Sequence, residues 1–141
     1  MTAALPRKLV VDANRVLSAL LKDGTTRRAL FLTDAVLVSP LKMLEEVKRH
    51  LPSVSLRTGV PLSRLGALLA LIAARIGWVG PQDYVGHLQT AEAALAHVDP
   101  EDVAYLACAL AVGADAIWSH DLDFDRQQLV PRIPHPDAEI P

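Results

Sequence analysis

The chain has 141 residues, a length typical of one domain built around a single hydrophobic core. Hydrophobic residues make up 51% and charged residues 21%, which excludes an intrinsically disordered protein. The longest apolar runs are too short to span a bilayer, and a single cysteine, Cys108, excludes an internal disulfide framework. We therefore expect a single domain over residues 1–141 that works in the cytoplasm and has no membrane partner.

The net charge of −2 conceals an uneven distribution of charge along the chain. Residues 1–58 contain ten Lys and Arg against five Asp and Glu, net +5, whereas residues 59–141 contain four against eleven, net −7. This distribution is compatible with a protein that binds a polyanion through one part of its chain and processes it with a metal ion at another part. Solvated helix faces explain the same asymmetry, and charge alone favours this simpler interpretation.

The first elements alternate between strand and helix. Lys8–Asp12 is a short apolar run that ends on an acid, which is typical of a buried strand in a parallel sheet. Helical spacing follows over Asn14–Lys22 and ends at Asp23-Gly24. A second helix is predicted over 25–33, capped by one of the two threonines that open it, and a second strand over Ala35–Ser39.

The middle of the chain predicts further helices around one short strand. Pro40 opens a helix that ends near Pro52. The segment Pro61–Arg75 is rich in Ala and Leu and predicts a helix that packs on a neighbouring helix or at a subunit interface. Ile76–Gly80 predicts a short edge strand, and helical spacing returns over Tyr84–Val98.

The last third completes an alternating pattern of strands and helices. Asp99 caps a helix that runs to about Val112, and Ala116–Ser119 predicts another buried strand. The loop 120–127 carries three aspartates at alternate positions, and a last short strand is predicted around 132–133. Such alternation predicts an α/β fold, a three-layer α/β/α sandwich with a central, mostly parallel sheet.

Acidic residues follow two of the predicted buried strands. Asp12 and Asp121 should both lie at the carboxyl edge of the sheet, where open α/β sheets bind ligands. Two further acids could face the same cleft. They are Asp102, from the helix before the second of these strands, and a glutamate from the helix after Pro40. Neighbouring carboxylates raise one another's pKa unless a cation neutralises them, and oxygen ligands suit Mg²⁺ or Mn²⁺. Such an ion activates water and stabilises charge on a phosphodiester.

Simpler roles compete for each of these acids. Asp12 could cap the following helix, and Asp102 could serve the dipole of its own helix. Glu45 and Glu46 could be exposed helix acids. The DxDxD run over 121–125 lacks the glycine and distal glutamate of an EF-hand, which sets calcium aside. The five histidines have no metal-ligand spacing, and neither a P-loop nor a GxGxxG pattern is present.

Four segments of the chain resemble the successive motifs of PIN domains, in particular of VapC-like toxins from prokaryotic toxin–antitoxin pairs. They have the family's order and spacing over nearly the whole chain: Val10–Leu20, Ser39–Val47, Asp99–Ala107 and Ala116–Phe124. The resemblance implies a PIN-like fold and an endoribonuclease that cleaves RNA with Mg²⁺ or Mn²⁺. In this sequence the implied catalytic and metal-binding acids are Asp12, Glu46, Asp102 and Asp121.

The resemblance also assigns roles to neighbours of these acids. Glu46 is preferred to Glu45 because an aliphatic residue, Val47, follows it as in the family. Asp123 is expected as an auxiliary metal ligand. His120 departs from the small or amide residue that is usual at its position, which bears on substrate contact. The residues expected to bind substrate are Asn14, Arg15, Ser119 and His120.

The expected partners are RNA, a second copy of the chain and, for a toxin, its antitoxin. The homodimer is expected through the helix 61–75, and an antitoxin arginine would block the acids because a guanidinium pairs with carboxylates. The rivals are a PIN nuclease of RNA processing without a toxin role and a catalytically inactive PIN-fold binding module. A flavodoxin- or receiver-like domain is more remote, since its loops are not apparent. The basic residues expected to hold the RNA backbone are Arg15, Lys22, Arg27, Arg28, Lys48 and Arg49.

Overall fold

A parallel sheet forms the centre of the computed structural model, which describes residues 5–21, 24–95 and 97–141. Its strands lie in the order β3-β2-β1-β4-β5, and every neighbouring pair is parallel. The strands are β1 (Lys8–Val11), β2 (Val36–Pro40), β3 (Ile76–Val79), β4 (Ala116–Trp118) and β5 (Arg132–Ile133). The expected mostly parallel sheet is confirmed, and β3 and β5 stand where the sequence predicts short strands.

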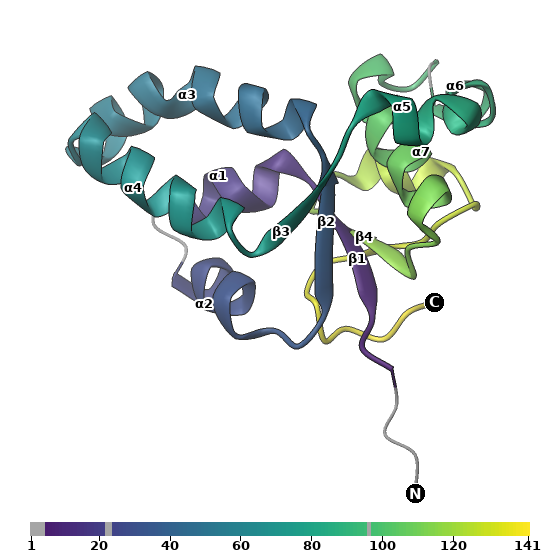
Figure 1. The fold of residues 1–141 in the computed structure, drawn as a ribbon, viewed down its shortest axis with the longest axis horizontal. Coiled ribbons are helices and arrows are strands. Elements are labelled where there is room, and N and C mark those ends of the chain that lie inside the picture. The colour runs from purple at the N-terminus through teal and green to yellow at the C-terminus, as the bar shows by residue number, and fades with distance from the viewer. Residues whose placement is uncertain (1–4, 22–23, 96) are drawn as a thin grey trace, which may run out of the picture.

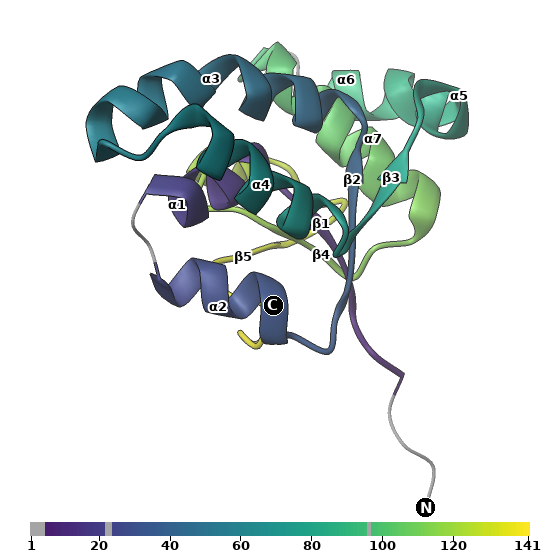
Figure 2. The same cartoon turned by 60° about the vertical axis from the view of Figure 1, so that its left-hand side comes forward.

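Helices cover both faces of this sheet, as Figures 1 and 2 show. The layer on the left in Figure 1 contains α1 (Ala13–Leu21), α2 (Gly24–Leu32), α3 (Lys42–Thr58) and α4 (Leu62–Ala73). The layer on the right contains α5 (Pro81–Tyr84), α6 (Leu88–Leu95) and α7 (Val103–Val112). This arrangement confirms the predicted three-layer α/β/α sandwich. No helix in the described part of the chain has the length and apolar character of a bilayer-spanning segment.

The central strands and α7 are buried because helices lie on both sides of the sheet. The side chains of 9–11 in β1 and of 116–118 in β4 are at most 1% exposed, so each strand is apolar throughout rather than alternating. Tyr105 to Ala109 of α7 are also all buried. Cys108 lies among them, and burial raises the pKa of its thiol to about 12, which is typical of an unreactive, buried cysteine.

The order of the strands reverses between β1 and β4, and this reversal places the candidate site. From β1 the chain passes through α1 to α4 to reach β2 and β3 on one side, whereas β5 follows β4 on the other side. The return from β3 to β4 runs through the opposite layer. Asp12 directly follows β1, and its amide donates a hydrogen bond of 3.1 Å to the carbonyl of Trp118 in β4. Open α/β sheets bind ligands beyond the carboxyl ends of strands at such a reversal.

Helix α3 extends further than the sequence predicts. It was expected to end near Pro52 but continues to Thr58 with this proline inside it. A proline removes one helical hydrogen bond. Pro52 itself is exposed, whereas Val47 before it and Val54 after it are buried on the inner face of the helix. Packing of this apolar face therefore outweighs the local loss. The helix ends at Gly59, whose φ of 72° is left-handed.

Two other predicted helices differ in their bounds. The helix expected over Tyr84–Val98 is divided into the end of α5, the 3₁₀ turn η1 (Val85–His87) and α6, since Tyr84 has a φ of −120° and a ψ of 2°. The threonines expected to cap α2 lie inside it, because the helix already begins at Gly24. The predicted end of the first helix at Lys22 and Asp23 lies outside the described residues.

Candidate metal centre

Asp12 is a buried carboxylate held in one orientation at the carboxyl end of β1. It is 7% exposed, and its Oδ2 accepts hydrogen bonds from Ser119 Oγ at 2.6 Å and from Asn14 Nδ2 at 2.8 Å. Burial raises the pKa of Asp12 to about 6 against the lowering effect of its hydrogen bonds. The charges of Asp121 and Glu46 raise the pKa further, so three of the expected acids act on one another electrostatically.

Asp102 is the most perturbed acid of this region. It ends the 3₁₀ turn η2 (Pro100–Asp102) that leads into α7 and is 5% exposed. Burial raises the pKa of Asp102 to about 8, and the charges of Asp121, Asp99 and Asp12 add to this rise. Its Oδ2 is buried and finds no hydrogen-bond partner within the described residues. A buried carboxylate oxygen without a donor is costly, so this atom fits a bound cation.

Asp102 belongs to a cluster of four aspartates. Each offers one carboxylate oxygen, and these oxygens all lie within 4.8 Å of one another. Asp99 Oδ1 accepts the amide of Glu101 at 2.9 Å, and Asp121 Oδ1 accepts the amide of Asp123 at 2.9 Å, which fixes two of the carboxylates. A compact set of carboxylate oxygens suits a hard divalent ion. The four members of this aspartate cluster are Asp99, Asp102, Asp121 and Asp123.

Glu46 reaches the same region from α3, in the opposite layer from α7. Its Oε2 accepts a hydrogen bond of 3.0 Å from the hydroxyl of Tyr105, and its Oε1 lies 3.1 Å from Lys42 Nζ. The ammonium of Lys42 also lies 3.5 Å from Glu101 Oε2. Burial raises the pKa of Tyr105 and the charge of Glu46 raises it further, so this hydroxyl keeps the proton that it donates. The neighbouring Glu45 is exposed, whereas Glu46 acts on Asp12 by its charge.

Three of the residues expected to bind substrate instead support the acids through hydrogen bonds. Asn14 donates to both Asp12 and, at 3.2 Å, Ser119 Oγ. Ser119 is fully buried, and its Oγ accepts the amide of Asp121 at 2.9 Å. Arg15 is 5% exposed, and its Nε donates to Asn14 Oδ1 at 2.9 Å. The guanidinium therefore orients Asn14, which in turn orients Asp12.

The remaining expected contacts with RNA lie at the surface. His120 is exposed, and its Nε2 lies 3.2 Å from the carbonyl of Pro134. Lys48 and Arg49 are exposed on α3, whereas Arg27 is partly buried and donates to the carbonyl of Ala19. Lys22 lies outside the described residues.

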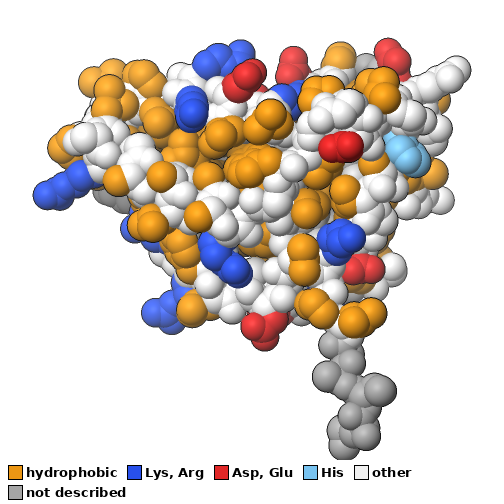
Figure 3. Space-filling view, viewed as in Figure 1, with side chains coloured by type: hydrophobic (Ala, Val, Ile, Leu, Met, Phe, Trp, Pro, Cys, Tyr) orange, Lys and Arg blue, Asp and Glu red, His pale blue; other side chains and the backbone are white. Residues whose placement is uncertain are grey.

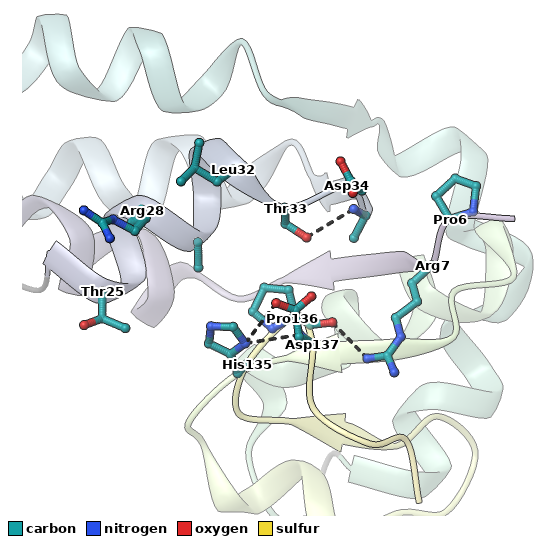
Figure 4. A pocket seen from close by; sticks show the side chains of 12 residues that line it. Pro6, Arg7, Thr25, Arg28, Leu32, Thr33, Asp34, His135, Pro136 and Asp137 are labelled. Atoms are coloured by element: carbon teal, nitrogen blue, oxygen red, sulfur yellow. Dashed lines mark hydrogen bonds and ion pairs between the residues drawn. The ribbon is translucent and has the colours of Figure 1, made fainter. Parts of the chain in front are cut away.

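A hollow of about 470 Å³ lies at the opposite, amino edge of the sheet (Figure 4). It is formed by α2, the chain before β1 and the C-terminal tail, and exposed Arg28 is on its wall. Arg7 is committed to the tail through a hydrogen bond of 2.9 Å to the carbonyl of Pro136. Asp34 and Asp137 also line this hollow, but the described residues form no group of three or more potential metal ligands there, and no member of the aspartate cluster is on its wall.

Asp99 is the acid of the cluster that the sequence analysis treats only as a helix cap. Its spacing of three residues from Asp102 contains the missing signal, because side chains at i and i+3 of a 3₁₀ turn lie on the same side. Sequence reasoning also gave no role to Lys42 and Tyr105. Their contacts with Glu46 join distant parts of the chain, and no local pattern reports them.

Comparison with known families adds one finding. A model of the family described as PIN domain matches residues 10–128. This span begins within β1 and ends after the 3₁₀ turn η3 (Leu122–Arg126), so it contains every acid of the candidate centre. None of the curated proteins compared matches the chain.

Proposed function

The chain belongs to the PIN domain family, and from this premise we propose that it is a metal-dependent endoribonuclease that hydrolyses RNA phosphodiester bonds. PIN domains are generally metal-dependent nucleases, and the aspartate cluster is compatible with a divalent metal. The observation that carries the proposal is the buried, unpartnered Oδ2 of Asp102 inside this cluster, since a cation would satisfy it. A merely structural acid at this position would have a protein donor.

The residues that would hold Mg²⁺ or Mn²⁺ are the acids around the reversal of strand order. Asp102, Asp121 and Asp123 offer oxygens of one cluster, and Asp12 and Glu46 contribute charge beside it. When bound, such an ion lowers the pKa of water and stabilises the charge that develops on a phosphodiester.

The protein's own side chains orient the reacting groups. Ser119 and Asn14 both donate to Oδ2 of Asp12, which keeps this carboxylate fixed at the sheet edge. Held in this way beside the acids of the cluster, Asp12 would accept the proton of the attacking water. Lys42 and Tyr105 hold Glu46 on the other side of the site.

Substrate binding is proposed for the exposed polar residues near these acids. Lys48 and Arg49 of α3 would contact the phosphate backbone, and His120 would contact RNA beside Asp121. Arg15 would act through Asn14, since its guanidinium is buried.

We also propose that the protein is the toxin of a toxin–antitoxin pair and works in the cytoplasm. This finer assignment is supported by the resemblance of its four motifs to VapC-like toxins. An antitoxin would inhibit it by directing an arginine at the aspartate cluster, where Asp99, Asp102, Asp121 and Asp123 have no ion pair with a basic side chain of the described chain. Rescue of growth by a co-expressed neighbouring gene would separate a toxin from a PIN nuclease of RNA processing.

A homodimer through α4 is proposed from the outer face of this helix. Leu62 and Leu71 are 51% and 61% exposed, and Ala67, Ala70 and Ala74 are exposed beside them. Figure 3 shows hydrophobic side chains gathered over α3 and α4. A contiguous apolar surface of this kind is typical of a protein interface.

The experiment that tests the activity is cleavage of a mixed single-stranded RNA by the purified protein with Mn²⁺, with Mg²⁺ and with EDTA. Asp12→Asn and Asp121→Asn should abolish metal-dependent cleavage. Asp115→Asn is the matched control, because Asp115 is an exposed acid at the amino edge whose side chain caps the amide of Lys8. A wild-type protein that neither cleaves RNA nor binds Mn²⁺ in calorimetry would instead be an inactive binding module.

A further inference from the structure

Asp99 stands at the start of η2 with its side chain turned toward three other aspartates. Its carboxylate belongs to the cluster whose oxygens lie within 4.8 Å of one another. We propose that Asp99 is a metal ligand that completes a cation site with Asp102, Asp121 and Asp123. This inference deepens the proposed nuclease function and rests on it. It differs from the assignment made from motifs, in which Asp99 has only a capping role.

The unpartnered Oδ2 of Asp102 indicates where the cation would sit. Asp102 is 95% buried, and this oxygen has no donor among the described residues. Asp99 is the N-cap of η2 and Asp102 is its last residue, and a carboxylate oxygen of each lies within 4.8 Å of the other. A cation that satisfies the Asp102 oxygen is therefore within reach of Asp99.

Capping alone does not explain an acid at position 99. The cap uses Oδ1, which accepts the amide of Glu101 at 2.9 Å, and serine or asparagine would cap equally well without a charge. The charge of Asp99 instead adds to the repulsion among four carboxylates whose oxygens lie within 4.8 Å of one another. No ion pair among the described residues compensates it, and Lys42 pairs with Glu46 and Glu101. A bound divalent cation converts this repulsion into attraction.

Lys42 also holds η2, the turn that presents Asp99 and Asp102, in place. Its ammonium lies 3.5 Å from Glu101 Oε2 and donates to the backbone carbonyl of Glu101 at 3.1 Å. Because Glu101 lies between Asp99 and Asp102, these contacts attach η2 to α3. The two aspartates are thereby presented by a fixed turn rather than by a free loop.

The test is the affinity of the full chain for Mn²⁺, measured by calorimetry on Asp99→Asn and Asp99→Ser. Both variants retain an oxygen that can accept the Glu101 amide, and serine lacks a carbonyl that could still bind the ion. Asp115→Asn is the matched control, because it removes one negative charge from an exposed side chain at the amino edge of the sheet, and asparagine retains an oxygen for the Lys8 amide. Metal-free thermal melts verify that every variant is folded.

We expect Asp99→Ser to weaken Mn²⁺ binding by about tenfold or more and Asp99→Asn somewhat less, with Asp115→Asn within about twofold of wild type. Asp99 variants that bind Mn²⁺ as tightly as Asp115→Asn would overturn the inference while leaving the proposed nuclease intact. A wild-type protein that binds no Mn²⁺ would overturn both. These two failures are therefore distinguishable.

Discussion

Asp102→Asn should stabilise the metal-free protein at neutral pH and remove its response to metal. Burial and three neighbouring acids oppose the charge of Asp102 in the folded state. Asparagine has nearly the same shape without the charge. The variant therefore resembles the protonated protein at every pH.

The size of the effect follows from the raised pKa of Asp102. This pKa is about 8 in the folded protein against 3.8 ordinarily, so the folded state binds more protons than the unfolded state between these values. The stability contributed by this group is present below pH 4 and is lost as the pH rises toward 8. At pH 7 the difference between the two pKa values sets an upper limit of about 4 kcal/mol on the gain in the free energy of unfolding for Asp102→Asn. Solvent screening reduces this gain to about 1–2 kcal/mol. For a domain of this length that corresponds to roughly 3–8 °C in Tm.

Calorimetric melts in EDTA at pH 5, 6, 7 and 8 measure the difference between Asp102→Asn and wild type. The gain in Tm should grow with pH, whereas Asp115→Asn at the amino edge should show no such growth. Adding Mn²⁺ at about a hundredfold its Kd should stabilise wild type by about 2.7 kcal/mol and the variant by much less.

The reasoning would be refuted if Asp102→Asn were less stable than wild type in EDTA at pH 8. It would also be refuted by a difference that is the same at pH 5 and pH 8, because a packing effect has no such pH dependence. Equal stabilisation of both proteins by Mn²⁺ would remove Asp102 from the metal site.

Three further outcomes are expected. Ser119→Ala should lower the rate of RNA cleavage by about tenfold, because Asp12 and Asp121 both lose the hydroxyl that orients them; an unchanged rate would contradict this support role. Lys42→Met should weaken Mn²⁺ binding and Lys42→Arg should largely restore it, whereas the loss of a positive charge alone would tighten cation binding. Calorimetry on both variants, with the exposed Lys48→Met as control, shows whether the affinity for Mn²⁺ falls or rises. Leu71→Glu should convert a dimer into a monomer in light scattering at unchanged Tm, since Leu71 is 61% exposed, and an oligomeric state that does not change would exclude α4 as the interface.

Much of the fold and part of the site could be predicted because their signals are local. The runs of apolar residues before Asp12 and before Ser119 mark strands covered on both faces, and the alternation of strands with helices then fixes the edge where the acids meet. Pro52 illustrates where local rules fail. Its helix-breaking effect is real, but burial of Val47 and Val54 on the same helix outweighs it.

The contacts around the acids could not be predicted in the same way. Tyr105 and Glu46 are 59 positions apart, and their hydrogen bond depends on how α7 and α3 pack across the sheet edge. The burial of Arg15 is likewise a result of packing. From the sequence alone, a basic residue after the first motif is expected to contact RNA. Asp99 has a local signal in its spacing from Asp102, but the capping role masks it.

The pairing of β1 with β4 has a consequence for synthesis of the protein. Val11 lies beside Trp118 in the sheet, so the first and the fourth strand are joined only after most of the chain has left the ribosome. A nascent chain that ends before Ala116 contains Asp12 without β4, the strand that leads to Asp121 and Asp123. The candidate metal centre therefore cannot assemble until this last part of the chain has been made.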